Sequence, residues 1–582
     1  MAITERFLGC FLIAALSCSS AIAQVDAHGN NNTETKFTSR TELALVPAVV
    51  TDKYGHHITG LTREDFVVRE NGVEQKIATF DEIKSDPHRL SRWKGPDEFS
   101  NSLADGGMSA RITVIVLDLL NTPFTAQADA RKDLLKYLTQ SVDQREPTGL
   151  YTLTRNGIQT VHDFTTDPRV LLAALHKLRG DEDHTVDAPE VVESVTGTAS
   201  PEGSAGQNPG IAARLGSGTD SVNPGAVKSE FQRLQMMLSQ DAELSLQSFQ
   251  QRLAITYTLQ GMQQLAQALA GVPGRKSLIW ASGGFPFTVS GETMYIAPLA
   301  RDSLTDVLPM YERTWQLLNA AQIALYPVDV KGLEAVTMAP ASIRRPGRNY
   351  GQNAILRQMD MHATFDLFAA ATGGRAYYDS NDLVKGFNDA VNDSAEYYML
   401  GYYLDQSKTR AGWHKLTVKV NRDHAQVRAR SGFFVTTTTV NPENSRNTDI
   451  ALALQSPLDY TSLPLVVHWD KVETAKDPGR RHVSYRIRLE PDAELISEAD
   501  NNHIVLDFVA QPQTLEGKDL DHPVGERIDA HPGEEKLPAI HRDGIIYAGA
   551  LDLSPGKYMV HFVVRDDLSG RLGSVTAPLK VE

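Results

Sequence analysis

The chain has 582 residues, which is too long for a single hydrophobic core and predicts roughly two to four domains. Lysine and arginine total 57 against 72 aspartate and glutamate residues, so the formal net charge is −15. This acidity excludes a broad cationic surface, and with it a nucleic acid or an anionic membrane as the expected partner.

Residues 1–23 have the pattern of a secretory signal peptide. Arg6 closes a short basic region, Phe7–Cys18 is an apolar run, and Ala21-Ile22-Ala23 is a small-x-small cleavage site. The apolar run is shorter than the ~20 residues that span a bilayer, and no later segment is suited to span one. We predict a secreted, periplasmic or cell-envelope protein cleaved near Ala23, with no transmembrane segment in the mature chain. Lipid anchoring at Cys18 is the alternative.

Both cysteines of the chain, Cys10 and Cys18, lie in this leader. The mature chain would therefore contain no thiol. Disulfides, thiolate catalysis and zinc–sulfur sites are excluded by this expectation.

The residues after the leader predict a short β region. Residues 24–40 are polar and Asn-rich, which is typical of a flexible leader. Residues 41–84 predict a small β domain, with a strand at 43–50 and a hairpin turn at Asn71-Gly72. Residues 85–110 are polar and predict a linker.

Residues 111–435 alternate between strand and helix patterns, which predicts a Rossmann-like, doubly wound parallel sheet. The expected strands are 112–118, 149–154, 277–282, 324–329 and 375–378. The expected helices are 126–140, 168–178, about 230–269, 305–322 and 364–371. Asp167 is placed to cap the helix that begins at Pro168. Residues 181–228 lose all periodicity and predict a disordered insertion.

The remainder of the chain has strand patterns. Antiparallel strands are expected at 397–403 and 415–420, where apolar and polar residues alternate in the second segment. Residues 436–456 predict a junction. Residues 457–582 predict an immunoglobulin-like β-sandwich, with strands at 483–489 and 558–564. The overall fold class is thus α/β, with the central domain flanked by β-sandwich domains.

Three of the predicted strands end in a small or acidic polar residue, at Asp118, Ser282 and Asp329. Open α/β sheets place their ligand sites at the carboxyl ends of their strands. We therefore expect the three ends to meet at one crevice, to which Asn121 and Thr122 also contribute.

Several segments together resemble the von Willebrand factor type A domain family, and more narrowly the VWFA-related proteins abundant in Acidobacteria. The segments are Val49–Gly55 with Leu61–Phe66, Leu117–Thr122, Gly274–Gly284, Tyr326–Asp329, and Tyr397–Tyr402 with Arg428–Phe433. The resemblance spans about residues 41–435. It implies an exported, non-enzymatic adhesion-type protein that binds an unknown protein or cell-surface partner.

The resemblance also implies a degenerate metal site. Type A domains hold Mg²⁺ or Mn²⁺ through Asp-x-Ser-x-Ser, a threonine and a second aspartate, because hard cations prefer oxygen ligands. Asp118 matches the first aspartate and Thr122 the second serine, whereas Leu120 replaces the first serine and Ser282 the second aspartate. The possible ligands are therefore Asp118, Thr122 and Ser282. The alternative is that Asp118 caps the next helix or accepts backbone N–H groups.

Two other functions stay open at this point. One is an envelope scaffold without a ligand at the crevice, which a crevice plugged by Leu120 or Phe285 would favour. The other is a serine hydrolase, since Ser282, Asp329 and His362 follow the chain order of α/β-hydrolases. The hydrolase motif needs a glycine where this chain has Trp280, which argues against it.

Overall fold

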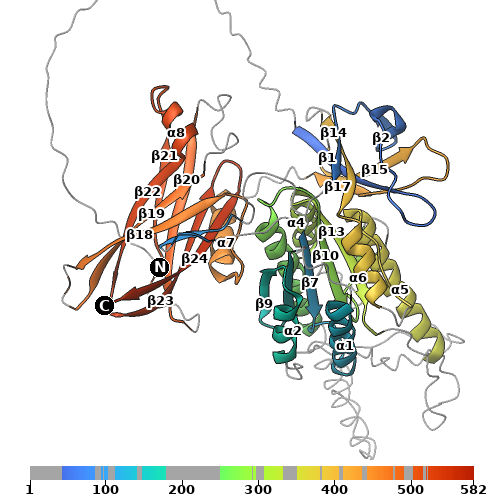
Figure 1. Ribbon diagram of the computed structural model, residues 1–582, viewed down its shortest axis with the longest axis horizontal. Helices are drawn as coiled ribbons and strands as arrows, with labels where there is room; N and C mark the ends of the chain where they lie inside the picture. The colour runs from blue at the N-terminus through green and yellow to red at the C-terminus, as the bar shows by residue number, and fades with distance from the viewer. Residues whose placement is uncertain are drawn as a thin grey trace, which may run out of the picture. The chain divides into compact units, whose positions relative to one another are not determined.

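The structure is a computed structural model. It describes residues 42–84, 93–95, 97–102, 112–140, 147–178, 249–290, 293–295, 307–331, 350–379, 383–404, 410–435, 442–475, 477, 479–490, 502–515, 520 and 522–582. In this part the chain is a mixed α/β protein, with one largely parallel sheet and otherwise antiparallel sheets (Figure 1). The predicted segments 1–23, 24–40 and 181–228 lie outside the described residues. None of the described helices combines the length and apolar character needed to cross a membrane.

The largely parallel sheet has the strand order β13-β10-β7-β8-β9. Its strands are β7 (Ile112–Asp118), β8 (Thr148–Thr154), β9 (Gly157–Thr165), β10 (Lys276–Ser282) and β13 (Ile323–Asp329). The first four in sheet order are parallel, as predicted, whereas the edge strand β9 is antiparallel to β8 and was not predicted. The predicted strand at 375–378 is reduced to an isolated parallel bridge between Val328 and Tyr377.

Helices cover both faces of this sheet, which is why its inner strands are apolar on both sides. The helices are α1 (Phe124–Gln140), α2 (Pro168–Lys177), residues 249–269, α4 (Val307–Ala320), α5 (Tyr350–Thr372) and α6 (Leu383–Asn392). One face shares a buried core with α1, α2 and α6, and the other with residues 249–269, α4 and α5. Asp167 accepts a hydrogen bond from the backbone N–H of Arg169 at 2.9 Å, which confirms the predicted cap of α2.

A second part of the structure consists of two antiparallel sheets, ordered β16-β1-β14-β4 and β17-β15-β2-β3, with one shared core. The strands are β1 (Glu42–Thr51), β2 (Phe66–Glu70), β3 (Val73–Gln75), β4 (Thr79–Lys84), β14 (Glu396–Leu404), β15 (Gly412–Val420), β16 (Gln426–Ala429) and β17 (Gly432–Val435). Asn71 and Gly72 have φ of 49° and 86°, which confirms the predicted hairpin turn. A short 3₁₀ helix, Arg63–Asp65, precedes β2.

This pairing corrects two predicted boundaries. Residues 41–84 do not form a domain of their own, because β1 pairs with β14 and β16, and β2 pairs with β15. Residues 396–435 belong with these strands and not with the parallel sheet. The physical reason is that the apolar side of β1 and β2 is covered only when the later strands complete both sheets.

A third part also has two antiparallel sheets that share one core, ordered β22-β19-β18-β6-β5 and β21-β20-β23-β24. The strands are β5 (Trp93–Gly95), β6 (Glu98–Ser100), β18 (Leu465–Thr474), β19 (Arg481–Leu489), β20 (Ile504–Gln513), β21 (Val524–Ala530), β22 (Ile545–Leu553), β23 (Gly556–Asp566) and β24 (Leu572–Val581). The other described elements are α7 (Pro442–Gln455), α8 (Leu537–Asp543), β11 (Thr288–Ser290) and β12 (Thr293–Tyr295).

The predicted linker at 85–110 is corrected by β5 and β6. Strand β6 pairs with β18, and the following residue, Asn101, is fully buried. The Asn101 amide nitrogen donates to the carbonyl oxygens of Tyr460 and Leu463, at 2.5 and 2.8 Å, and its oxygen accepts from the Leu465 N–H at 2.9 Å. The described residues of this stretch, 93–95 and 97–102, are therefore part of the edge of the C-terminal sheet.

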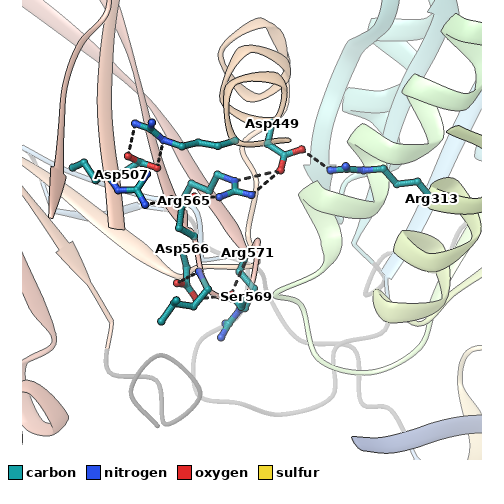
Figure 2. A network of polar contacts seen from close by, with 11 residues as sticks. Arg313, Asp449, Asp507, Arg565, Asp566, Ser569 and Arg571 are labelled. Atoms are coloured by element: carbon teal, nitrogen blue, oxygen red, sulfur yellow. Dashed lines mark hydrogen bonds and ion pairs between the residues drawn. The ribbon is translucent and has the colours of Figure 1, made fainter. Parts of the chain in front are cut away.

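Helix α7 lies within the predicted junction 436–456 and is held by ion pairs that involve buried carboxylates (Figure 2). Arg446 contacts the Asp507 carboxylate on β20, with the shorter N–O distance 2.6 Å. Asp449 accepts from Arg565 on β23 at 3.2 Å and from Arg313 on α4 at 2.5 Å. Asp449 is 4% exposed, so its charge depends on these two guanidinium groups.

We expect Asp449→Asn to lower the free energy of unfolding by about 2 kcal/mol, because it removes the buried carboxylate that Arg313 and Arg565 share and leaves Arg565 paired with Asp567 alone. Denaturant unfolding measures the loss. The matched control is Asp543→Asn, which breaks the exposed pair with Arg542 (2.7 Å) and should leave the free energy of unfolding almost unchanged, because solvent screens that pair. Equal losses in the two variants would show that Asp449 does not anchor α7.

Candidate functional site

The ends of β7, β10 and β13 lie side by side at one edge of the sheet. The register pairs Ser282 with Asp329, and Ala281 with Leu117 one residue before Asp118. Beyond the strands, the backbone N–H of Gly283 donates to the Thr122 hydroxyl oxygen at 2.8 Å. The expectation that the three strand ends share one edge is confirmed.

The Asp118 carboxylate is surrounded by hydrogen-bond donors. Oδ1 accepts from the Asn121 backbone N–H (2.9 Å) and side-chain amide (3.1 Å). Oδ2 accepts from the same amide (2.9 Å), the Trp280 indole N–H (3.0 Å) and the Ser282 hydroxyl (2.9 Å). Asp118 is 1% exposed, so this cluster is a buried carboxyl group whose two oxygens are satisfied by neutral donors. The expectation that Asp118 accepts a backbone N–H is confirmed.

The loop after β7 is tied to its surroundings by the same residues. The Asn121 amide also donates to the Thr258 hydroxyl of the helix over residues 249–269, at 2.9 Å. Leu120 is fully buried in the core on that side of the sheet. Gln127 of α1 donates to the backbone oxygens of Leu119 and Thr122, both at 3.1 Å. The loop is therefore fixed from three directions.

Gly283 allows the end of β10 to approach this loop. A Cβ atom at Gly283 would lie 2.9 Å from Pro123 Cδ and 3.1 Å from the Asn121 carbonyl oxygen. Those distances are shorter than ordinary van der Waals contact. A side chain at Gly283 would therefore separate the two strand ends and lengthen the hydrogen bonds to Asp118.

Burial and hydrogen bonding have opposite effects on the pKa of Asp118. Desolvation raises the pKa of Asp118, and the donors from Asn121, Trp280 and Ser282 partly offset that increase. Every described contact of the carboxylate is a donor, which suits the ionised form. The described hydrogen-bond partners of Asp118 are all neutral groups, with no cationic side chain among them.

Asp329 lies at the same edge but has contacts of its own. Its carboxylate accepts from the Lys331 backbone N–H at 2.9 Å and lies 3.5 Å from His362 Nε2. Burial raises the pKa of Asp329. His362 stacks on Tyr378 with ring centroids 4.0 Å apart, and its Nδ1 is 3.8 Å from Asp379. Of the five predicted crevice residues, four form one network and Asp329 is its neighbour.

The predicted metal ligands do not fit a hard cation in this arrangement. Mg²⁺ takes about six oxygen ligands at ~2.1 Å, several of them waters. Here both Asp118 oxygens accept hydrogen atoms, and the Thr122 hydroxyl accepts from Gly283. The adjoining cavity, which Asp118 and Thr122 help to line, has a volume of about 10 Å³, room for one water at most. Metal binding therefore stays a prediction, which the titration proposed below tests.

The hydrolase residues are not assembled around Ser282 in the described part of the chain. The Ser282 hydroxyl oxygen lies 2.9 Å from Asp118 Oδ2 and 2.5 Å from the Gly284 carbonyl oxygen. His362 contacts the carboxylates of Asp329 and Asp379 instead. No imidazole among the described residues is hydrogen-bonded to Ser282, so the base that nucleophilic catalysis requires is not in place.

A larger polar cavity lies elsewhere, between β1, β16 and α6, with a volume of about 250 Å³. Its lining consists of Thr51, Asp52, Lys53, Tyr54, Gly55, His57, Arg375, Lys385, Asp389, Asn392, Asp393, Gln426 and Arg428. Lys385 pairs with Asp389 at 2.9 Å, and Arg428 pairs with Asp393 at 2.5 Å. Lys53 and Arg375 form no ion pair with a carboxylate that the structure describes. The sequence analysis missed this cavity because its walls come from segments far apart in the chain.

Comparison with known proteins does not assign the chain to a family. No protein-family model matches the chain, and no curated protein matches its sequence. The resemblance to type A domains therefore stays a prediction. The function is inferred from the contacts of the described residues.

We expect Asp118→Asn to lower the free energy of unfolding at neutral pH by about 2 kcal/mol or more. Asparagine replaces one of the two acceptor oxygens with an NH₂ group, which cannot accept a hydrogen bond. At least one of the buried donors that faced Asp118 therefore loses its partner. Chemical denaturation checks this loss. Asp163→Asn is the control, because Asp163 lies on the edge strand β9 and is only partly buried.

Asp118→Asn also tests whether burial or hydrogen bonding has the larger effect on the pKa of Asp118. Because burial raises the pKa of Asp118 in the folded state, the folded protein takes up the proton more readily than the unfolded chain as pH falls. The stability of the wild type relative to Asp118→Asn should therefore increase as pH falls from the raised folded-state pKa of Asp118 towards its lower unfolded-state pKa. If the wild type instead loses stability relative to Asp118→Asn as pH falls over this range, the hydrogen-bond donors lower the pKa of Asp118 by more than burial raises it.

Proposed function

We propose that this protein is an exported, non-enzymatic structural component of the cell envelope or surface. In this proposal a von Willebrand factor type A-like domain lies in the chain between β-sandwich domains that act as spacers. The observation that carries the proposal is the shell of donors around Asp118, which leaves the strand-end crevice closed. The crevice would then stabilise the domain and would not receive a ligand.

Three features support this function. The largely parallel sheet with helices on both faces is consistent with a type A-like domain. The two pairs of antiparallel sheets each bury a common core, which suits spacer domains of the sandwich type. Leu120 is buried and Phe285 packs against Phe365 and Phe368, so both side chains belong to the apolar core beside the strand ends.

The decisive experiment is a calorimetric Mg²⁺ titration of the wild type, Asp118→Asn and Thr122→Val. We expect no saturable heat in any of them at millimolar Mg²⁺, and the same melting temperature in Mg²⁺ and in EDTA. The physical reason is that the ligand oxygens are occupied by protein donors. Saturable heat in the wild type that both variants abolish would instead establish the cation-dependent adhesion site.

A second function, the binding of an anionic group, is favoured by the 250 Å³ polar cavity. Asp389 and Asp393 are neutralised by Lys385 and Arg428, which leaves Lys53 and Arg375 as exposed cations at its wall. Asp52 also lines the cavity, so four cations face three carboxylates and a carboxylate or phosphate of a protein or cell-surface partner would find a surplus of one positive charge there. Under this hypothesis the protein binds a partner, as the sequence predicts, but at the polar cavity and not at the strand ends.

Pyrophosphate is a suitable probe of this cavity. We expect Lys53→Gln with Arg375→Gln to weaken pyrophosphate binding at least about tenfold, and added salt to weaken binding to the wild type. Isothermal calorimetry measures both effects. A variant with Lys471→Gln and Arg542→Gln removes two exposed cations outside the cavity and should bind like the wild type. If both double variants bind pyrophosphate equally weakly, the loss of affinity comes from the change in net charge and not from the cavity.

A further inference from the structure

Two histidines and an aspartate lie together at one end of the β20–β21 pair. The antiparallel register pairs Ile504 with Ala530, so it places His503 opposite His531. Asp529 precedes His531 by two residues, and side chains two apart on a strand share a face. All three side chains therefore lie on the same face, at neighbouring positions of two hydrogen-bonded strands.

The side-chain atoms are close enough to share one ion. One ligating atom from each residue lies within 4.8 Å of the other two. His503 Nε2 is 2.8 Å from Asp529 Oδ1, and the two imidazole rings stack with centroids 4.3 Å apart. Asp529 and His531 are exposed and His503 is partly exposed, so an ion can reach them from solvent.

We propose that His503, Asp529 and His531 form a binding site for a borderline divalent transition metal ion, with Zn²⁺ as the reference ion. Two imidazole nitrogens and one carboxylate oxygen are the ligand types that Zn²⁺ and Cu²⁺ prefer. Mg²⁺ and Ca²⁺ prefer oxygen-only sites and are not expected to compete. The remaining coordination position would be open to water or to a side chain of a partner.

The geometry requires only small side-chain movements. Zn²⁺ binds nitrogen and oxygen at ~2.0–2.2 Å, so tetrahedral ligand atoms lie about 3.4 Å apart. The His503–Asp529 contact is shorter than this, and the widest separation in the cluster is 4.8 Å or less. Rotation of the exposed side chains can close the set, with the ion replacing the proton between His503 and Asp529. The site lies on the C-terminal sheets and is independent of the function proposed above.

The test uses the full mature chain without a histidine tag. Calorimetric titration with Zn²⁺ should give one site per chain with a dissociation constant of about 10 µM or tighter. His503→Ala and His531→Ala should each weaken binding at least about tenfold, since each removes one of three ligands. About 1 mM Mg²⁺ should not displace Zn²⁺.

The matched control is His482→Ala. His482 pairs with Asp552 at 2.7 Å on the exposed side of β19, and the described residues place no second histidine with them. This variant should bind Zn²⁺ as the wild type does. Electron paramagnetic resonance of bound Cu²⁺ should show two nitrogen ligands in the wild type and one in His531→Ala. The proposal is overturned if wild-type binding is as weak as that of His531→Ala, or if His482→Ala causes the same loss.

Discussion

A carboxylate buried at the end of a central strand is the constraint around which the parallel sheet is arranged. Such a charge is expensive to bury unless its oxygens are hydrogen-bonded. Asp118 obtains its donors from the loop that follows its own strand and from the neighbouring strand β10. Trp280 and Ser282 both donate to Asp118 from one side of β10, and Gly283 after them leaves room for the loop. A strand end that resembles a ligand site is thus used to hold two strands and a loop together.

The parts of the fold that were predictable are those that depend on local pattern. The apolar run from Ile112 to Asp118 indicates a strand buried on both faces, and Asn71-Gly72 and Asp167 mark a turn and a helix start by their own chemistry. Strand partners were not predictable in this way, because hydrogen bonding between distant strands leaves no local signal. The segment around Asn101 is polar and short, and nothing within it indicates a partner in the C-terminal sheet.

The candidate site shows the same division. Asp118, Asn121, Thr122 and Ser282 were identified from the strand-end pattern, but the direction of their hydrogen bonds was not. Trp280 argued against a hydrolase, yet its indole N–H supplies one of the donors to Asp118. A period of two along β10 places Trp280 and Ser282 on one face, which was the available signal. The cluster at His503 depends on strand register and has no counterpart in a sequence motif.

The strand pairing also bears on the order in which the chain can fold. The Asn101 side chain finds its acceptor at Tyr460, 359 residues further along the chain. Strand β1 likewise pairs with β14, and all the strands of the parallel sheet lie between these two strands in the sequence. A polypeptide that emerges from the ribosome amino end first carries these edges unpaired until Leu404 and Tyr460 of the 582 residues have been made, and unpaired edges favour aggregation. The long sequence separation between paired strands therefore makes the unfinished chain more exposed to edge-to-edge association than the folded protein.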